Sequence, residues 1–216
     1  MKAQSLAQKA RLADREGENN RAAELFLKAS KLLETSSRWQ IFSPFYKASS
    51  VIEHAEAASR KEELEAASEQ SRQARDMLVE VEGSLEEDLR AARSEDERAT
   101  IGELIDDVRL RSKYCFARSE LEEGKSLSRR VDRSKSLEKF AKAKALFEDL
   151  SNAQVSEEER NQLQTLAMSC TAEEKLAYGE QTADPNAYAE ASQIFQAIRD
   201  RSRTKSVRTV TLGHLS

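Results

Sequence analysis

The segment "AAELFLKASKLLE", residues 22–34, decides the fold class of this chain. Phe26, Ala29, Leu32 and Leu33 are separated in it by three, three and one residues. These spacings place all four side chains on one face of an α-helix. The alanine lets a neighbouring helix backbone approach closely. The rest of the chain can therefore be searched for the same unit: an aromatic residue, then Ala, then two adjacent apolar residues.

Three further copies of this unit occur along the chain. They are Phe45, Ala48, Val51 and Ile52; Phe140, Ala143, Leu146 and Phe147; and Tyr188, Ala191, Ile194 and Phe195. Three of the four units follow an Ala that has a Gly seven residues after it, namely Ala10 and Gly17, Ala117 and Gly124, and Ala172 and Gly179. Glycine commonly ends a helix because it adopts the left-handed backbone conformation. Each set therefore predicts a helix, a glycine stop and a second helix.

Capping patterns locate the expected helices. They are Asn19-Asn20, Ser43-Pro44, Asp184-Pro185, and the capping-box pairs Ser94 with Glu97 and Ser156 with Glu159. We expect helices near 2–16, 20–36, 43–59, 60–82, 84–93, 95–124, 134–150, 156–179 and 185–201. Only the short segment SVRTVTL, residues 206–212, alternates weakly with the period of a strand. The sequence predicts an all-α fold.

A single antiparallel hairpin leaves apolar surface exposed, so several hairpins are expected to stack. The predicted architecture is an α-solenoid of stacked antiparallel hairpins, and an elongated helical bundle is the alternative. We expect four parts: a three-helix unit at 1–59, long acidic helices resembling a coiled coil at 60–113, two helical hairpins at 114–201, and a basic tail at 202–216.

Two oppositely charged regions lie within this division. Residues 61–107 hold 16 acidic and 6 basic residues. In the same region, eight residues fall near heptad a and d positions: Leu64, Ala67, Ser71, Ala74, Leu78, Val81, Leu85 and Ala92. Residues 125–148 carry 8 basic and 3 acidic residues. Arg129, Arg130, Arg133, Arg201 and Arg203 form a candidate basic patch, although charge runs are more commonly solvated helix faces.

The segments KARLADREGENNRAAELFLKASKLLE and KLAYGEQTADPNAYAEASQIFQAI resemble tetratricopeptide repeats, with a small residue and Gly before a loop and an aromatic residue and Ala after it. Residues 2–59 also resemble a microtubule-interacting and trafficking (MIT) domain. That likeness rests on Ala10, Asp14, Gly17, Ala23, Phe26, Ala29 and Leu33, with FYKASSVIEHAEAA as the third helix. The resemblance implies a groove for a partner's helix and a link to AAA ATPases or membrane-scission machinery.

No motif for chemistry is apparent. Cys115 and Cys170 lie in apolar helical runs and are expected to be buried, reduced thiols. The two histidines, His54 and His214, lack the spacing of a metal site. We expect no enzyme activity and no cofactor. The chain lacks a signal peptide and a run of apolar residues long enough to span a membrane, so a cytoplasmic protein is expected.

The expected function is that of a scaffold or adaptor that binds a helix or peptide of another protein in a groove between hairpins. Phe26, Trp39, Phe45, Phe140 and Tyr188 are the candidates for partner binding or hairpin packing. A self-assembling coiled-coil protein and an adaptor for an AAA ATPase or trafficking system are the alternatives. A homo-oligomer is left open, whereas the net charge of −4 argues against a chain that coats nucleic acid.

Overall fold

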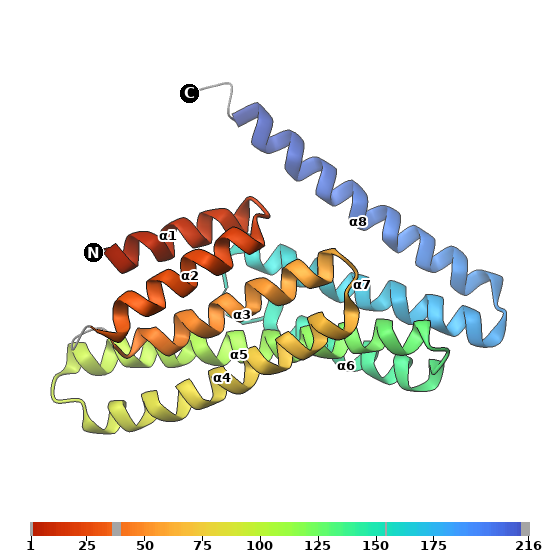
Figure 1. Ribbon diagram of the computed structural model, residues 1–216. Coiled ribbons are helices and arrows are strands. Elements are labelled where there is room, and N and C mark those ends of the chain that lie inside the picture. Colours follow the sequence, from red (N-terminus) through yellow and green to blue (C-terminus); the bar gives the residue numbers. More distant parts are fainter. Residues whose placement is uncertain (1, 36–39, 154, 213–216) are drawn as a thin grey trace. The chain divides into compact units, whose positions relative to one another are not determined.

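A computed structural model describes the backbone of residues 2–35, 40–153 and 155–212, and the side chains of these residues as far as 201. The described residues form eight α-helices and no strand (Figure 1). They are α1 (Lys2–Arg15), α2 (Asn19–Glu34), α3 (Phe42–Arg60), α4 (Leu64–Ala91), α5 (Glu95–Arg129), α6 (Arg133–Ser151), α7 (Glu157–Thr182) and α8 (Pro185–Leu212). The all-α prediction is confirmed.

Two expectations about the helices are wrong. A break at Gly83 does not occur, because α4 runs without interruption from Leu64 to Ala91. The last helix does not end near 201 as expected, because α8 continues to Leu212 and includes the segment 206–212. A lone glycine is tolerated inside a long helix whose apolar face is well packed, so tertiary packing outweighs its low helix propensity.

The capping predictions separate into two groups. Ser156 and Glu159 form the expected capping box, and the Asp184 carboxylate accepts a hydrogen bond from the Asn186 backbone N–H at 2.9 Å. Asn19 and Ser43, in contrast, lie inside their helices with buried side chains. Ser43 Oγ donates to the Ser30 carbonyl at 3.1 Å, which ties α3 to α2.

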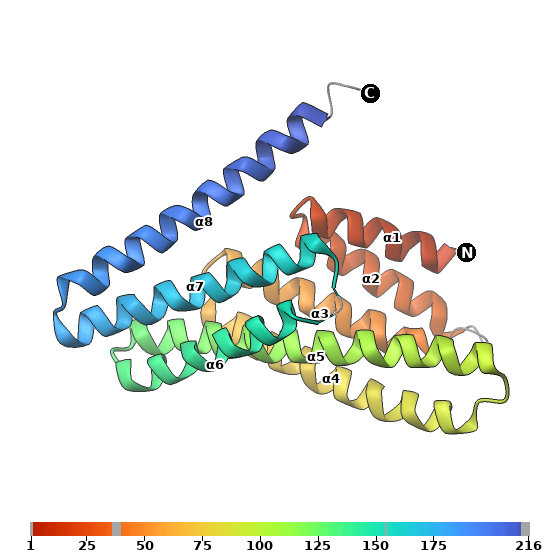
Figure 2. The ribbon, with the colours of Figure 1, turned by 180° about the vertical axis from the view of Figure 1, so that it is seen from behind.

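The chain divides into two compact units, residues 1–122 and 123–216. The boundary falls within α5. The finer four-part division expected from the sequence stays a prediction. In each unit, consecutive helices pack against one another in a stacked arrangement: α1 on α2, α2 on α3 and α3 on α4 in the first, α6 on α7 and α7 on α8 in the second (Figures 1 and 2).

Small residues bring the first helices close together. The buried face of α1 consists of Ala3, Ala7, Ala10 and Ala13. Phe26 of α2 packs against Ala7 and Ala10 of this face. Phe26, Ala29 and Leu33 of the stripe that decides the fold are buried in the first unit, whereas Leu32, expected on the same face, is 46% exposed.

The main core of the first unit lies between α3, α4 and α5. It combines Phe45 and Ile52 of α3 with Leu78 of α4 and Val108 of α5, among other residues. All eight heptad residues expected at 64–92 are buried. The narrow apolar seam of α4 is therefore covered within the chain.

Glycine has two different roles in the hairpins. Gly17 has a φ of 79° in the turn between α1 and α2, as expected for a helix stop. Gly124 and Gly179 lie inside α5 and α7, so the prediction that they end helices is wrong. A Cβ at Gly124 would lie 2.7 Å from Phe140 Cε1, and one at Gly179 would lie 3.3 Å from the Tyr188 ring. Both glycines make room for the aromatic residue of the following helix.

None of the helices within the described residues has the length and apolar character required to cross a membrane.

Candidate functional site

Three aromatic side chains remain exposed on the last hairpin of the second unit: Tyr178 of α7 and Tyr188 and Phe195 of α8. Tyr188 and Phe195 are seven residues apart, which is close to two helical turns, so they lie on the same face of α8. Their exposed fractions are 40% and 37%. We call Tyr188 and Phe195 the α8 aromatic face.

Contacts between α7 and α8 fix the position of the α8 aromatic face. Ala187 and Ala191 are buried, and α8 packs against α7. Gly179 of α7 leaves space beside Ala187 and the Tyr188 ring, since an added Cβ would lie 3.3 Å from either. Lys175 and Glu190 form an ion pair of 2.6 Å that also joins the two helices. Tyr188 therefore lies at the edge of the contact between α7 and α8, with one part of its ring beside Gly179 and the residue still 40% exposed.

The copy of the aromatic repeat on α6 is buried, unlike the copy on α8. Phe140 and Phe147 of α6 have the same seven-residue separation, and both are fully buried. Phe140 packs beside Gly124 of α5, and α6 also packs against α7. The unit on α6 thus has neighbours that cover both rings, whereas the rings of Tyr188 and Phe195 are more than one-third exposed.

The other aromatic candidates occupy different positions. Phe26 and Phe45 are buried in the first unit, where they contribute to helix packing. The Phe26 ring stacks with Tyr46, with 6.0 Å between ring centroids. Trp39 lies outside the described residues.

The candidate basic patch is distributed over several helices of the second unit and the end of α5. Arg129 and Arg130 are exposed near the end of α5 and in the turn after it. Arg133 of α6 pairs with Glu180 of α7 at 3.3 Å, so part of its charge is compensated. Arg201 is exposed on α8, and the side chain of Arg203 lies outside the described residues.

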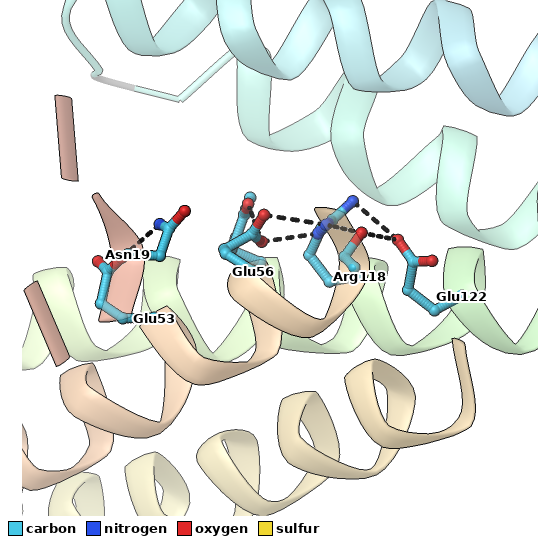
Figure 3. Close-up of polar contacts among 7 residues, drawn as sticks. Asn19, Glu53, Glu56, Arg118 and Glu122 are labelled. Carbon is cyan, nitrogen blue, oxygen red and sulfur yellow. Dashed lines mark hydrogen bonds and ion pairs between the residues drawn. The ribbon is translucent and has the colours of Figure 1, made fainter. Parts of the chain in front are cut away.

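A buried charged network in the first unit was missed by the sequence analysis (Figure 3). The Arg118 guanidinium of α5 donates two hydrogen bonds to the Glu56 carboxylate of α3, at 2.8 and 2.9 Å. It also forms an ion pair of 3.1 Å with Glu122. Ser59 donates to Glu122 at 2.8 Å, and Tyr114 donates to Glu56 at 2.8 Å. The network fastens α3 to α5.

Burial alone would lower the pKa of Arg118, but the carboxylate of Glu56 and other nearby negative charge raise it above its ordinary value. Burial, followed by the charge of Glu56, also raises the pKa of Tyr114 well above its ordinary value. The arginine is therefore permanently charged and the tyrosine is neutral. This arrangement suits a structural ion pair, because neither group can exchange a proton near neutral pH.

A shallow depression on α4 and α5 is a weaker candidate for ligand binding. Its lining consists of Glu86, Leu89, Arg90, Gly102, Ile105, Asp106 and Arg109. Arg109 already binds Glu82 at 2.6 Å and Glu86 at 2.8 Å. The acidic and basic side chains in the lining balance, so the depression has no net charge that would select a ligand.

Cys115 and Cys170 are both buried as reduced thiols. Burial raises the pKa of Cys115 to about 12, so the thiol is protonated and unreactive. Within the described part of the chain, no three His, Cys, Asp or Glu side chains gather in a way that could hold a metal ion.

Comparison of the chain with protein-family models, with curated proteins and with solved structures gives no match.

Proposed function

We propose that the chain is a non-enzymatic interaction module of tetratricopeptide-like architecture, and that its α8 aromatic face binds an amphipathic helix of a partner protein. One contrast supports this proposal. Phe140 and Phe147 are fully buried between helices, whereas Tyr188 and Phe195, which repeat the same spacing, are 40% and 37% exposed. The α8 aromatic face has the side-chain pattern of an interior face without the corresponding cover.

A helix is the occupant that this pattern fits best. Two rings separated by two turns lie about 10 Å apart along α8, a distance that one helix laid alongside can contact at both ends. Helix-in-groove recognition uses apolar anchors at such spacings. Aromatic residues are also enriched among those that dominate binding free energies. We therefore assign the main contacts to Tyr188 and Phe195.

The polar surroundings of the face indicate how the partner is held. Glu190 is paired with Lys175, and Gln196 forms hydrogen bonds with Arg199 and Asp200. Charges of both signs therefore occur around the rings, and each of them already has a polar partner. Binding that depends mainly on apolar burial is weakly sensitive to salt, unlike binding to the phosphates of nucleic acid.

The likeness to known families forms part of this proposal. The stacked hairpins are compatible with a helical repeat, and α1 to α3 occupy the segment that resembles an MIT domain. A cytoplasmic site of action also belongs to the proposal. The heptad seam of α4 is buried within the chain, so coiled-coil assembly through that seam is the less favoured alternative.

Charge substitutions on the aromatic face test the proposal. Tyr188→Glu and Phe195→Glu are each compared with the unchanged chain in quantitative affinity capture, followed by binding of a synthetic peptide that copies the captured segment. Val79→Glu is the matched control, because Val79 is an exposed apolar residue of another helix, α4. We expect at least a tenfold loss of peptide affinity for both face variants and no loss for the control.

Circular dichroism separates lost binding from lost folding, since both α8 variants should keep the helical content of the unchanged chain. The proposal is wrong if folded face variants bind the same peptide with unchanged affinity. It is also wrong if light scattering shows that the face instead joins two copies of this chain, with dimerisation abolished by Phe195→Glu.

A further inference from the structure

Asn19 and Glu53 form a buried polar pair between α2 and α3 (Figure 3). Asn19 Nδ2 donates to Glu53 Oε2 at 2.7 Å. Only 3% of Asn19 and 7% of Glu53 are exposed. Among the described residues, no donor lies within hydrogen-bonding distance of Asn19 Oδ1, although this oxygen is fully buried. Such an oxygen is rare in folded proteins because water can no longer solvate it.

The charges around Glu53 are mainly negative. The charges of Asp14 of α1 and Glu56 of α3 raise the pKa of Glu53, and the charge of Arg111 of α5 opposes them. The Arg111 guanidinium is held elsewhere, since it pairs with Asp107 at 3.1 Å and lies 5.1 Å from the Phe45 ring centroid. Burial and then the charge of Asp14 raise the pKa of Glu53 from its ordinary value of 4.5 to about 7.

A proton on Glu53 would supply a donor for Asn19 Oδ1 and would remove the negative charge of the buried carboxylate. A carboxylic acid and a carboxamide are planar groups that each offer one donor and one acceptor, so they can form two hydrogen bonds in parallel. In the structure Asn19 Nδ2 faces Glu53 and Oδ1 points away from it, so the second bond requires a rotation of the amide. After that rotation the hydroxyl of the acid would donate to Asn19 Oδ1, while the other carboxyl oxygen accepts from Nδ2. The carboxylate has no proton to donate and places a negative charge in a buried, acidic environment.

We propose that Glu53 and Asn19 form a proton-operated latch that holds the α1–α2 hairpin on α3. In its protonated form the pair makes two hydrogen bonds. Loss of the proton leaves one bond, an unsatisfied Asn19 oxygen and a buried charge that Asp14 and Glu56 repel. The α1–α2 hairpin therefore loosens from α3 as the pH rises. The latch is separate from the α8 aromatic face, and it does not depend on the function proposed above.

The direction of the pH effect follows from the two pKa values. Glu53 binds its proton more tightly in the folded chain than in the unfolded chain, where the pKa is near 4.5. Its contribution to the free energy of unfolding is therefore complete below pH 4.5 and is lost as the pH rises through about 7. A carboxylate in a salt bridge would show the opposite dependence.

The test combines a titration with a neutral variant of the full chain. Carbon-13 NMR of the glutamate carboxyl groups should give a midpoint near 7 for Glu53. Glu53→Gln replaces the acid with an amide that can form both hydrogen bonds at every pH. At pH 8 we expect this variant to have a higher melting temperature than the unchanged chain, and amides in residues 2–34 to be better protected from hydrogen exchange. Comparison at one pH cancels the intrinsic exchange rate.

Glu24→Gln is the matched control, because Glu24 is a glutamate of α2 whose side chain is 70% exposed. It should leave the pH dependence unchanged. A Glu53 midpoint between 4 and 5 would overturn the proposal, and so would a Glu53→Gln chain whose melting temperature falls with pH as steeply as that of the unchanged chain. If Glu53→Gln does not fold, the midpoint of Glu53 in the unchanged chain still tests the proposal.

Discussion

Arg118 and Arg109 lie on the same helix, α5, and each interacts with two carboxylates, but their exposure differs. The Arg118 side chain is 7% exposed and interacts with Glu56 and Glu122. The Arg109 side chain is 52% exposed and interacts with Glu82 and Glu86. Water screens the exposed pairs, so they contribute little to stability. Removal of Arg118 instead leaves Glu122, whose side chain is 1% exposed, and Glu56, whose side chain is 21% exposed, without their buried cation.

Replacing Arg118 with alanine should therefore destabilise the first unit strongly. We expect Arg118→Ala to lower the free energy of unfolding by about 3–5 kcal/mol, the range typical for one partner removed from a buried ion pair. Denaturant unfolding measured by circular dichroism gives this value. Arg109→Ala is the matched control and should leave the unfolding midpoint nearly unchanged. Similar midpoints for the two variants would contradict the structural role assigned to Arg118.

The sequence contains only part of the information needed to find this network. Arg118 and Glu122 are four residues apart on one helix, a spacing that predicts contact. Glu56, however, is 62 residues from Arg118 and meets it only because α3 packs beside α5. Asn19 illustrates the same difficulty, since its position suggested a cap while its amide lies buried against Glu53. Contacts between distant helices depend on the packing angle, which periodicity does not supply.

At the scale of the helices, apolar periodicity was sufficient to predict the all-α fold and the buried seam of α4. The structural role of each glycine was harder to predict, because glycine can either end a helix or let two helices approach closely. Gly17 ends a helix, Gly124 faces the Phe140 ring, and Gly83 has open space around it. The three cases differ in their neighbours in space, which the local sequence does not reveal.

These surroundings predict opposite effects of adding a methyl group to two helical glycines. Gly83→Ala should raise the free energy of unfolding by about 1 kcal/mol, since a Cβ there meets nothing and alanine favours the helix. Gly124→Ala should lower it by about 1–3 kcal/mol, because its Cβ would lie 2.7 Å from the fully buried Phe140 ring. Thermal and denaturant unfolding of both variants provide the measurement.

Each glycine variant serves as the control for the other, because both introduce the same methyl group within a helix. If Gly124→Ala stabilised the chain as much as Gly83→Ala does, then Phe140 would have room to move. The close approach of α5 and α6 would then not be a fixed feature of the second unit.

At the scale of the whole molecule, the chain is two stacks of helices built largely from alanine and a few large residues. The repeated aromatic unit was visible in the sequence, and it predicted stacked hairpins. The exposure of one copy was not visible, since the unit on α8 has the same spacing as the buried unit on α6. Exposure depends on which helices have neighbours on both sides, a property of the assembled stack.

A photo-crosslinking amino acid at Ser192 tests the central claim most directly. Ser192 is exposed and lies on α8 four residues after Tyr188 and three before Phe195, so a helix bound to the aromatic face would pass over it. The same crosslinker at Val79 of α4 is the control. We predict that the Ser192 crosslinker captures one amphipathic, helix-forming segment of another protein, and that Phe195→Glu abolishes this capture. Crosslinks only to the chain itself, or capture that is unchanged by Phe195→Glu, would contradict the account.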